Sequence, residues 1–445
     1  MKKILVIGSG KSAVTLIDYL LNESVNSNWN ITIADYNIDH ALKSAKNHIN
    51  SRPISFDIND VNQRNQEIDR ADIVVSMLPA SMHLLVAKAC ISFKKNLVTA
   101  SYVSKEIYEL DNLAKENGII LLNEIGLDPG IDHMSAMKVI DDLKSLGANI
   151  ISFKSFCGGL IHPNFDNNPW NYKFTWNPRN VVLAGQGTAQ YLLDKNYKYI
   201  PYNKLFKRTE IVNILNEGEF EAYANRDSLS YRESYGLDNI STIFRGTLRK
   251  KGFCKAWDIF VQLGMTSDEY KITNSEPMKC SDFTKLFLPK NDNLSLAENL
   301  CSYLSIAKNS DEFKKIEWLG IFSNDILGLD SATPAQFLQL ITEKKLSLED
   351  NDKDMIVMQH QFKFSINDKF KRLNSSLIVY GDNQRNTAMA KTVGLPVAIS
   401  VKLILNGSIK SVGVKIPTSK DIYIPILKEL EENGVNFIEE YSDLK

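Results

Sequence analysis

Residues 4–13, ILVIGSGKSA, decide the fold class of the first part of the chain. Four apolar residues, Ile4–Ile7, precede the spacing Gly8-x-Gly10-x-x-Ala13, and an amphipathic helical pattern follows it. This order predicts a buried strand, a tight turn and a helix, which is the context of a dinucleotide-binding motif. The glycine pair by itself is equally typical of a strand-to-helix turn that binds nothing.

Short apolar runs alternate with helical patterns along residues 1–126. Runs that are apolar throughout are typical of strands buried on both faces, and their alternation with helices predicts a Rossmann-type, doubly wound parallel sheet in an α/β protein. We therefore assign residues 1–126 to a nucleotide-binding domain. The expected strands are Ile4–Ile7, Ile31–Ala34, Ile73–Leu78, Leu97–Ala100 and Ile119–Leu122.

The pattern changes after Gly126, where aromatic residues cluster and turn residues multiply. We expect a second α/β domain with a mixed sheet at residues 127–390, which would bind substrate and form a dimer. A charged, Leu-rich stretch at about 285–350 predicts a small helical insert in it. Residues from about 390 to 445 are expected to complete the first domain.

Composition excludes several classes of protein. The 445 residues carry a formal net charge of −1, so nucleic acid is not an expected partner. Five widely spaced cysteines without a C-x-x-C pair indicate neither disulfides nor zinc, and favour the cytoplasm. No apolar run reaches about 18 residues, so no membrane span is expected.

In a dinucleotide turn, Gly8 permits the bend, Gly10 admits the pyrophosphate, and Ala13 allows close helix packing. Asp35 ends the second expected strand, where a carboxylate binds the ribose hydroxyls and repels a 2′-phosphate. The sequence therefore favours NAD as cofactor, with NADP as the alternative. Asp57, after the next strand, is expected near the adenine.

Several longer motifs carry a family resemblance. They are NEIGLDPGIDHMSAM (Asn123–Met137), SFCGGL (Ser155–Leu160), NPWNYKFTW (Asn168–Trp176), NRDS (Asn225–Ser228), FRGTLR (Phe244–Arg249), WLGIFS (Trp318–Ser323), DMIVMQH (Asp354–His360) and VGLPVAISVKLILNG (Val393–Gly407). Through these motifs the chain resembles the saccharopine dehydrogenase (L-glutamate-forming), or saccharopine reductase, family over essentially its whole length.

This resemblance implies that saccharopine is interconverted with L-glutamate and 2-aminoadipate 6-semialdehyde in lysine metabolism, with a nicotinamide cofactor, no metal, and a homodimer as the assembly. Lysine synthesis and lysine breakdown both remain open as the direction. Two other functions also remain: an imine reductase similar to carboxynorspermidine dehydrogenase, and a non-catalytic nucleotide-binding regulator.

Saccharopine has three carboxylates, which arginine binds as a fork of two N–H donors. The resemblance implies Arg226 and Arg249 as substrate-binding residues, with Thr247 beside them and Arg245 as a weaker candidate. Considered alone, each arginine is more typical of a solvated surface position.

The resemblance also implies that Ser101, Tyr102 and Asp128 contact the substrate. The catalytic candidates for proton transfer are Tyr102, Asp128 and Cys157. Helix capping is the alternative for Ser101 and for Asp128, and burial as an inert thiol is the alternative for Cys157. A structural role is expected for His133.

The expected cofactor-binding residues extend beyond the glycine turn. They are Gly8, Gly10, Lys11, Ser12, Ala13, Asp35, Asp57, Ile58, Leu78, Ala100, Ser101, Leu127, Asp128, Pro129 and Asn177. Lys11 is unusual for the family and is expected either at the pyrophosphate or in solvent. Asn171 replaces a usual glycine, and asparagine tolerates the same left-handed backbone.

Overall fold

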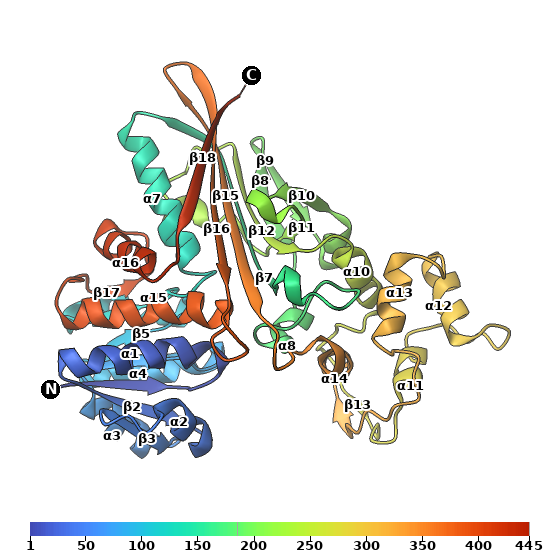
Figure 1. The fold of residues 1–445 in the computed structure, drawn as a ribbon, viewed down its shortest axis with the longest axis horizontal. Coiled ribbons are helices and arrows are strands. Elements are labelled where there is room, and N and C mark those ends of the chain that lie inside the picture. Colours follow the sequence, from blue (N-terminus) through green and yellow to red (C-terminus); the bar gives the residue numbers. More distant parts are fainter. Residues whose placement is uncertain (185, 445) are drawn as a thin grey trace. The chain divides into compact units, whose positions relative to one another are not determined.

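The computed structural model describes residues 1–184 and 186–444 (Figure 1). These residues form two compact units. Unit 1 is Met1–Asn149 with Leu377–Phe437, and unit 2 is Ile150–Ser376 with the residues from Ile438 onward. Unit 1 extends past the expected boundary at residue 126 because α7 (Ile131–Ser145) packs against α16 (Lys420–Glu432). The roles assigned to the two domains stay predictions.

Unit 1 is built on a seven-stranded sheet in which all the strands are parallel. The strand order is β17-β6-β5-β4-β1-β2-β3, so β1 lies between β2 and β4. The strands are β1 (Lys2–Ile7), β2 (Trp29–Asp35), β3 (Ser51–Ser55), β4 (Ile73–Ser76), β5 (Asn96–Val98), β6 (Ile120–Leu122) and β17 (Gly413–Lys415). This order confirms the predicted doubly wound α/β fold.

Helices cover both faces of this sheet because its strands are apolar on both sides. Leu5 and Ile7 join a core cluster with residues of α3 and α4, whereas α1, α15 and α16 pack together as a separate layer. The helices of unit 1 are α1 (Val14–Ser27), α2 (Ile38–Ala45), α3 (Val61–Arg70), α4 (His83–Phe93), α5 (Lys105–Tyr108), α6 (Asp111–Glu116), α7, α15 (Ala388–Leu405) and α16. Strands β4 and β5 end two residues earlier than their apolar runs, which leaves Met77 and Thr99 in loops.

Helix α15 is long and apolar enough by composition to cross a membrane, and 72% of it is buried within the structure. It packs against α1, and Figure 1 shows the two helices side by side. Gly394 makes this contact close, because a Cβ atom at this position would lie 2.8 Å from the backbone nitrogen of Leu16. Helix α15 is therefore a core helix that supports α1, the helix after the glycine turn.

Unit 2 is built on a mixed sheet of nine strands, as the sequence predicts. Strands β7 and β12 pair in parallel, whereas β11 pairs antiparallel with β10 and β12. The strands are β7 (Asn149–Ile161), β8 (Ala189–Leu193), β9 (Asn196–Ile200), β10 (Thr209–Asn213), β11 (Glu219–Ala224), β12 (Thr242–Arg249), β15 (Asp354–Ile366), β16 (Lys369–Tyr380) and β18 (Phe437–Asp443). The path through the sheet is β10-β11-β12-β7-β15-β16-β18, with β8 beside β12.

Unit 2 has an aromatic core to which α10 (Phe253–Leu263) contributes three rings. The Trp170 ring lies against the rings of Phe253, Trp257 and Phe260, and its indole N–H donates to the Lys315 carbonyl at 2.8 Å. The helices are α8 (Pro178–Val182), α9 (Tyr231–Ser234), α10, α11 (Cys280–Lys285), α12 (Leu296–Leu304), α13 (Asp311–Trp318) and α14 (Pro334–Leu346), and β13 (Ile272–Thr273) pairs with β14 (Ser331–Ala332). The expected insert at 285–350 contains α12, α13 and α14, joined by loops and by β14.

We predict that Gly394→Ala destabilises unit 1. Alanine ordinarily favours a helix over glycine by roughly 0.5–1 kcal/mol. Here its Cβ would clash with the backbone of α1, and overpacking typically costs about 1–3 kcal/mol. We therefore expect a net loss of free energy of unfolding, measured by chemical denaturation.

Lys391→Ala is the matched control, because it changes a half-buried residue of the same helix without adding volume at the contact. A Gly394→Ala protein as stable as the parent would contradict the close packing of α15 on α1.

Candidate active site

The glycine turn after β1 has the shape that the dinucleotide motif requires. Gly8 has φ +97°, and a Cβ atom there would lie 2.9 Å from the Met77 carbonyl oxygen. At Gly10, by contrast, no atom of the described residues other than Gly10 and its two neighbours in sequence lies within 4 Å of where a Cβ would stand. Ala13 is buried at the start of α1. The protein therefore requires glycine at position 8, whereas the open space at Gly10 fits the approach of a pyrophosphate.

Asp35 ends β2 and is held by the glycine turn. Its Oδ2 accepts hydrogen bonds from the Ser9 backbone N–H at 2.8 Å and from the Ser9 hydroxyl at 2.7 Å, and Oδ1 accepts from the Asn37 N–H at 3.0 Å. Burial raises the pKa of Asp35, but these hydrogen bonds and nearby His40 lower it on balance. Asp35 is thus an ionised, oriented carboxylate, as a ribose-binding residue must be. Ser9 was missed in the sequence, although it lies between the two glycines.

The remaining cofactor candidates of unit 1 follow the ends of the parallel strands, where ligands of such sheets bind. Lys11 is exposed, Ser12 is half-buried, and Asp57 is tied to Asn59 through its carboxylate. Ile58, Leu127 and Pro129 are buried, whereas Leu78 and Ala100 are half-buried.

Ser101 lies just past β5 and does not cap a helix, since Ser104 is the residue that caps α5. Its hydroxyl lies 2.7 Å from Nε2 of His83, and Nδ1 of His83 lies 2.8 Å from the hydroxyl of Ser76. His83 and Ser76 are both buried. Neither was identified from the sequence, because nothing in the local pattern links residues 76, 83 and 101.

Tyr102 and Asp128 come together in unit 1. The Tyr102 hydroxyl donates to Oδ1 of Asp128 at 3.2 Å. The N-cap residue of α7 is Gly130, two residues after Asp128. The buried His133 contacts the Glu124 carboxylate at 2.8 Å, in keeping with a structural role.

In unit 2, the strand register places three polar side chains in a row. Thr247 of β12 pairs with Cys157 of β7 on one side and with Tyr223 of β11 on the other. Paired residues of neighbouring strands point to the same face, so these three side chains share one face of the sheet. Arg249 and Glu221 form the next pair along that face. The row and the next pair together bring three of the expected residues, Cys157, Thr247 and Arg249, to one face of the sheet.

Arg249 is buried within an aromatic cage. Its guanidinium lies 5.0 Å from the ring centroid of Tyr172, 5.2 Å from Phe253 and 5.8 Å from Tyr223. One nitrogen donates to the Leu248 carbonyl at 2.8 Å, whereas Nε has no hydrogen-bond partner among the described residues. Burial lowers the pKa of Arg249, but Tyr223, Tyr172 and the nearby cysteines raise it on balance, so the guanidinium stays charged.

No carboxylate in residues 1–184 and 186–444 forms an ion pair with Arg249. A buried charge without a counterion costs several kcal/mol, so this site is suited to an anionic ligand. The NPWNYKFTW motif supplies one wall of the cage, Tyr172. Within the same motif Asn171 has φ +50°, the left-handed backbone expected for it.

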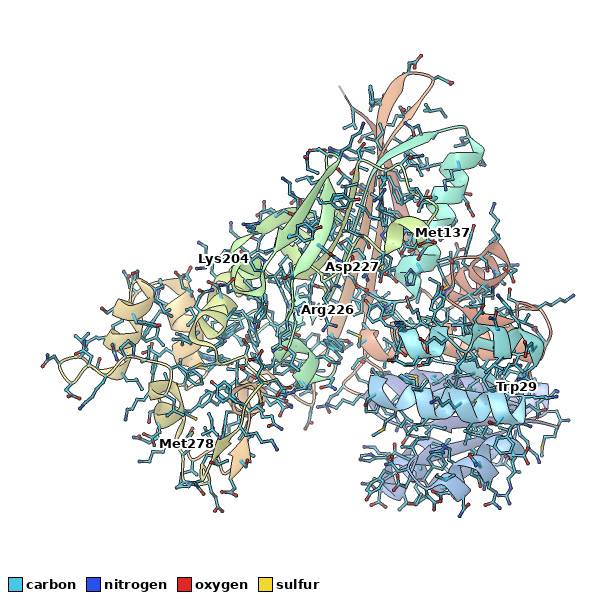
Figure 2. All side chains as sticks on the ribbon, turned by 180° about the vertical axis from the view of Figure 1, so that it is seen from behind. Trp29, Met137, Lys204, Arg226, Asp227 and Met278 are labelled. Carbon is cyan, nitrogen blue, oxygen red and sulfur yellow. The ribbon has the colours of Figure 1, made fainter. Side chains whose placement is uncertain are left out.

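The other unit 2 candidates occupy different environments. Arg226 is exposed after β11 (Figure 2). Burial raises the pKa of Tyr223 on balance, although the charges of Arg249 and, less strongly, Arg226 lower it. Arg245 is buried, with its guanidinium 4.1 Å from the Tyr231 ring centroid. Asn177 caps α8 by accepting a hydrogen bond from the Arg179 N–H at 2.9 Å. Arg249 is therefore the stronger anion-binding candidate.

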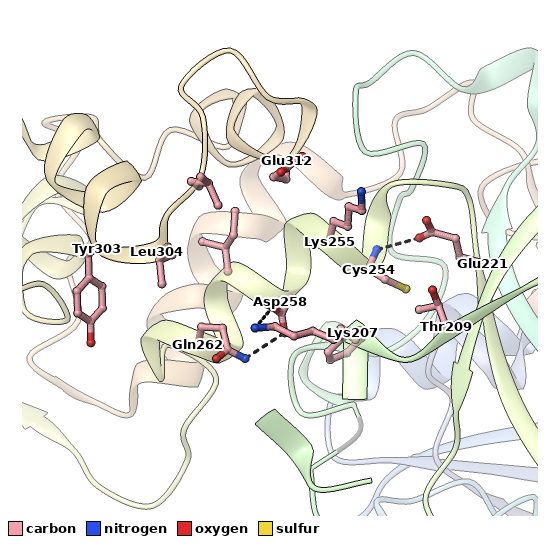
Figure 3. A pocket seen from close by; sticks show the side chains of 13 residues that line it. Lys207, Thr209, Glu221, Cys254, Lys255, Asp258, Gln262, Tyr303, Leu304 and Glu312 are labelled. Carbon is pink, nitrogen blue, oxygen red and sulfur yellow. Dashed lines mark hydrogen bonds and ion pairs between the residues drawn. The ribbon is translucent and has the colours of Figure 1, made fainter. Parts of the chain in front are cut away.

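A cavity of about 540 Å³ in unit 2 lies next to Cys254 and is lined by charged side chains of both signs (Figure 3). Glu221 accepts a hydrogen bond from the Cys254 N–H at 3.2 Å, and Asp258 is bound by Gln262 and Lys207. None of the site residues expected from the sequence lines this cavity. We assign it no part in the reaction.

Comparison with known proteins identifies the family. Residues 4–122 match the model of the saccharopine dehydrogenase NADP binding domain, and residues 126–435 match that of the saccharopine dehydrogenase C-terminal domain. The chain is 35% identical over 97% of both chains to saccharopine dehydrogenase [NADP(+), L-glutamate-forming] of Pyricularia oryzae. It is 34% identical to the mitochondrial alpha-aminoadipic semialdehyde synthase of Mus musculus, of which it covers 47%.

A solved structure agrees with these sequence matches. The apo saccharopine dehydrogenase (L-Glu forming) of Saccharomyces cerevisiae superimposes with a TM-score of 0.89 at 34% identity, over 99% of this chain and 100% of that one. With two family models that together span most of the chain and relatives of matching length, the chain belongs to the saccharopine dehydrogenase (L-glutamate-forming) family.

Proposed function

We propose that this enzyme interconverts saccharopine with L-glutamate and 2-aminoadipate 6-semialdehyde, as the names of its relatives suggest. The observation that supports this most directly is the buried, charged Arg249 without an ion-pair partner in the described part of the chain. A planar guanidinium suits a carboxylate, and saccharopine has three. We also propose that Thr247 and Arg226 bind this substrate. The reaction would belong to lysine metabolism.

We further propose that NAD is the preferred cofactor, although the relatives' names specify NADP(+). When bound, the nicotinamide supplies the hydride acceptor. Gly8, Gly10 and the start of α1 would hold the pyrophosphate, and Asp35 the ribose. The carboxylate of Asp35 would oppose a 2′-phosphate, since its orientation is fixed by Ser9. His40, 3.7 Å away, offsets that charge only when protonated.

For proton transfer we propose Asp128 and Tyr102. Oxidation at the secondary amine gives an imine, and its hydrolysis needs a group that activates water and protonates nitrogen. The Tyr102 hydroxyl and Asp128 carboxylate already share a hydrogen bond, so a proton can pass between them. Cys157 remains the other candidate, in the row with Thr247.

The function is tested by measuring saccharopine-dependent formation of the reduced cofactor with NAD and with NADP in parallel. We expect turnover with NAD at the higher kcat/KM. Turnover of carboxynorspermidine instead of saccharopine, or binding of NAD without any turnover, would contradict the proposed reaction.

We predict that Asp35→Ser relaxes the preference for NAD in this assay. Two like charges about 4 Å apart near a protein surface repel by roughly 4 kcal/mol at most. Removing the carboxylate should therefore lower the NAD-to-NADP ratio of kcat/KM by about 10- to 1000-fold. Asp39→Ser, which removes an exposed carboxylate of α2, is the control and should change the ratio little. An unchanged ratio in Asp35→Ser would place the specificity elsewhere.

We predict that Arg249→Met raises the KM for saccharopine without lowering thermal stability. The loss of a charge-assisted hydrogen bond costs about 1.5–3 kcal/mol, or about 10- to 150-fold in KM. Replacing an unpaired buried charge by an apolar side chain of similar size should meanwhile leave Tm equal or higher. The affinity for NAD should not change.

Lys154→Met is the control for Arg249→Met, because it removes a cation of β7 that pairs with Glu210. We expect no change in its KM. An Arg249→Met enzyme with normal KM would remove Arg249 from the substrate site.

We predict that Asp128→Asn lowers kcat about 100-fold or more, the usual effect of losing a group that transfers protons. Tyr102→Phe should also lower kcat and change its pH profile, because the substitution removes the hydrogen-bond partner of Asp128. Cys157→Ser should retain most activity. A larger loss in Cys157→Ser than in Asp128→Asn would reverse these assignments.

A further inference from the structure

Ser76, His83 and Ser101 form a hydrogen-bonded chain that leads from the interior of unit 1 to the loop after β5. The Ser76 hydroxyl lies 2.8 Å from Nδ1 of His83, and Nε2 of His83 lies 2.7 Å from the Ser101 hydroxyl. Ser76 is 0% exposed and His83 is 2% exposed, whereas Ser101 is half-buried. Only the Ser101 end of this chain is open to a ligand.

The imidazole of His83 is neutral, because burial lowers its pKa to about 4. A neutral imidazole has one N–H and one bare nitrogen, so it donates to one serine and accepts from the other. The direction of the chain therefore depends on which nitrogen has the proton.

The buried end of the chain selects the direction. His83 is the one hydrogen-bond partner of the Ser76 hydroxyl among residues 1–184 and 186–444. If Nδ1–H donated to Ser76, the hydroxyl hydrogen of this buried serine would have no acceptor, which is costly. When Ser76 donates to Nδ1 instead, its hydrogen is satisfied. Nε2 then has the proton and donates to the Ser101 oxygen.

This direction determines what Ser101 presents. Its oxygen accepts from His83, so its own hydrogen is available to a different acceptor, and the described residues provide none for it. The backbone of Ser101 is also held: its N–H donates to Oγ1 of Thr99 at 3.3 Å, and its carbonyl accepts from the Glu124 N–H at 3.0 Å.

We propose that His83 is a positioning residue, whose Nε2–H orients the Ser101 hydroxyl so that it donates a hydrogen bond to an oxygen of the bound ligand. That oxygen belongs either to a substrate carboxylate or to the carboxamide of the dinucleotide. Ser76 holds His83 in place, and His83 orients Ser101, so all three residues act on the ligand through the Ser101 hydroxyl. This inference rests on the function proposed above for its ligands.

The tautomer is measured directly, on protein without substrate. The protein has six histidines, so ¹⁵N-histidine labelling gives few ring signals. The His83 signals are those that disappear in His83→Gln. We expect ¹⁵N shifts of a neutral ring protonated at Nε2. A ring protonated at Nδ1, or a cationic ring at neutral pH, would overturn the proposal.

The effect on the ligand is measured in His83→Phe and Ser76→Ala, by kcat and KM for saccharopine and by the Kd for NADH from fluorescence titration. We expect His83→Phe to raise either the KM for saccharopine or the Kd for NADH about 10- to 100-fold. Ser76→Ala should raise the same constant about 2- to 10-fold. A higher KM with unchanged Kd identifies the substrate as the acceptor, and a higher Kd identifies the dinucleotide. His83→Gln, which retains a donor and an acceptor, should recover much of the loss.

Ser24→Ala is the control, because it removes a buried serine hydroxyl of unit 1 that bonds to the Leu21 carbonyl. This substitution should leave kcat, KM and Kd unchanged. Parent values of KM, kcat and Kd in Ser76→Ala and in folded His83→Phe would overturn the positioning role. Because the tautomer requires no turnover, it can overturn the proposal even if saccharopine is not the substrate.

Discussion

The pairing of β1 with β2 on one side and β4 on the other is the constraint on which the nucleotide site depends. The ladders continue beyond the strand ends: the Gly8 N–H donates to the Ala34 carbonyl, and the Met77 N–H donates to the Ile7 carbonyl, both at 2.8 Å. Gly8 is thereby pressed against Met77, where no side chain fits. With the turn so placed, Ser9 meets the carboxylate at the end of β2, and the start of α1 is fixed by its packing on α15.

Two serines use the same physical device in unit 1. Ser9 donates twice to Asp35, and the Ser101 hydroxyl is bonded to His83. A serine hydroxyl is short and loses little conformational freedom when it is ordered. Each pair therefore holds a polar group in one orientation before a ligand binds, and preorganisation of this kind reduces what binding itself must supply.

Arg249 illustrates the opposite arrangement, a buried charge without an ion-pair partner among the described residues. The aromatic rings of Tyr172, Tyr223 and Phe253 stabilise the guanidinium in part, through cation–π contacts. They cannot replace an anion, so folding leaves this site less stable than an apolar one would be. Functional sites commonly retain such an unfavourable group because a ligand can complete it.

The sequence by itself predicted the strand-turn-helix at residues 4–13, the parallel sheet of unit 1, the mixed sheet of unit 2 and the place of Asp35 at the end of its strand, and the family resemblance pointed to Arg249. These follow from glycine geometry, apolar periodicity and motifs, which are local properties of the chain. It also indicated the alternatives at Ser101 and Asp128, without deciding between them.

Only the tertiary structure decided which side chains meet. The bond from Ser76 to His83 and on to Ser101, and the cage of residues 172, 223 and 253 around Arg249, join positions far apart in the chain. The first segment of unit 1 likewise ends at Asn149 and not at the expected residue 126, because α7 packs against α16 near the C-terminus. Such contacts depend on strand order, register and burial, and no local pattern encodes them, because each arises only when separate elements pack together.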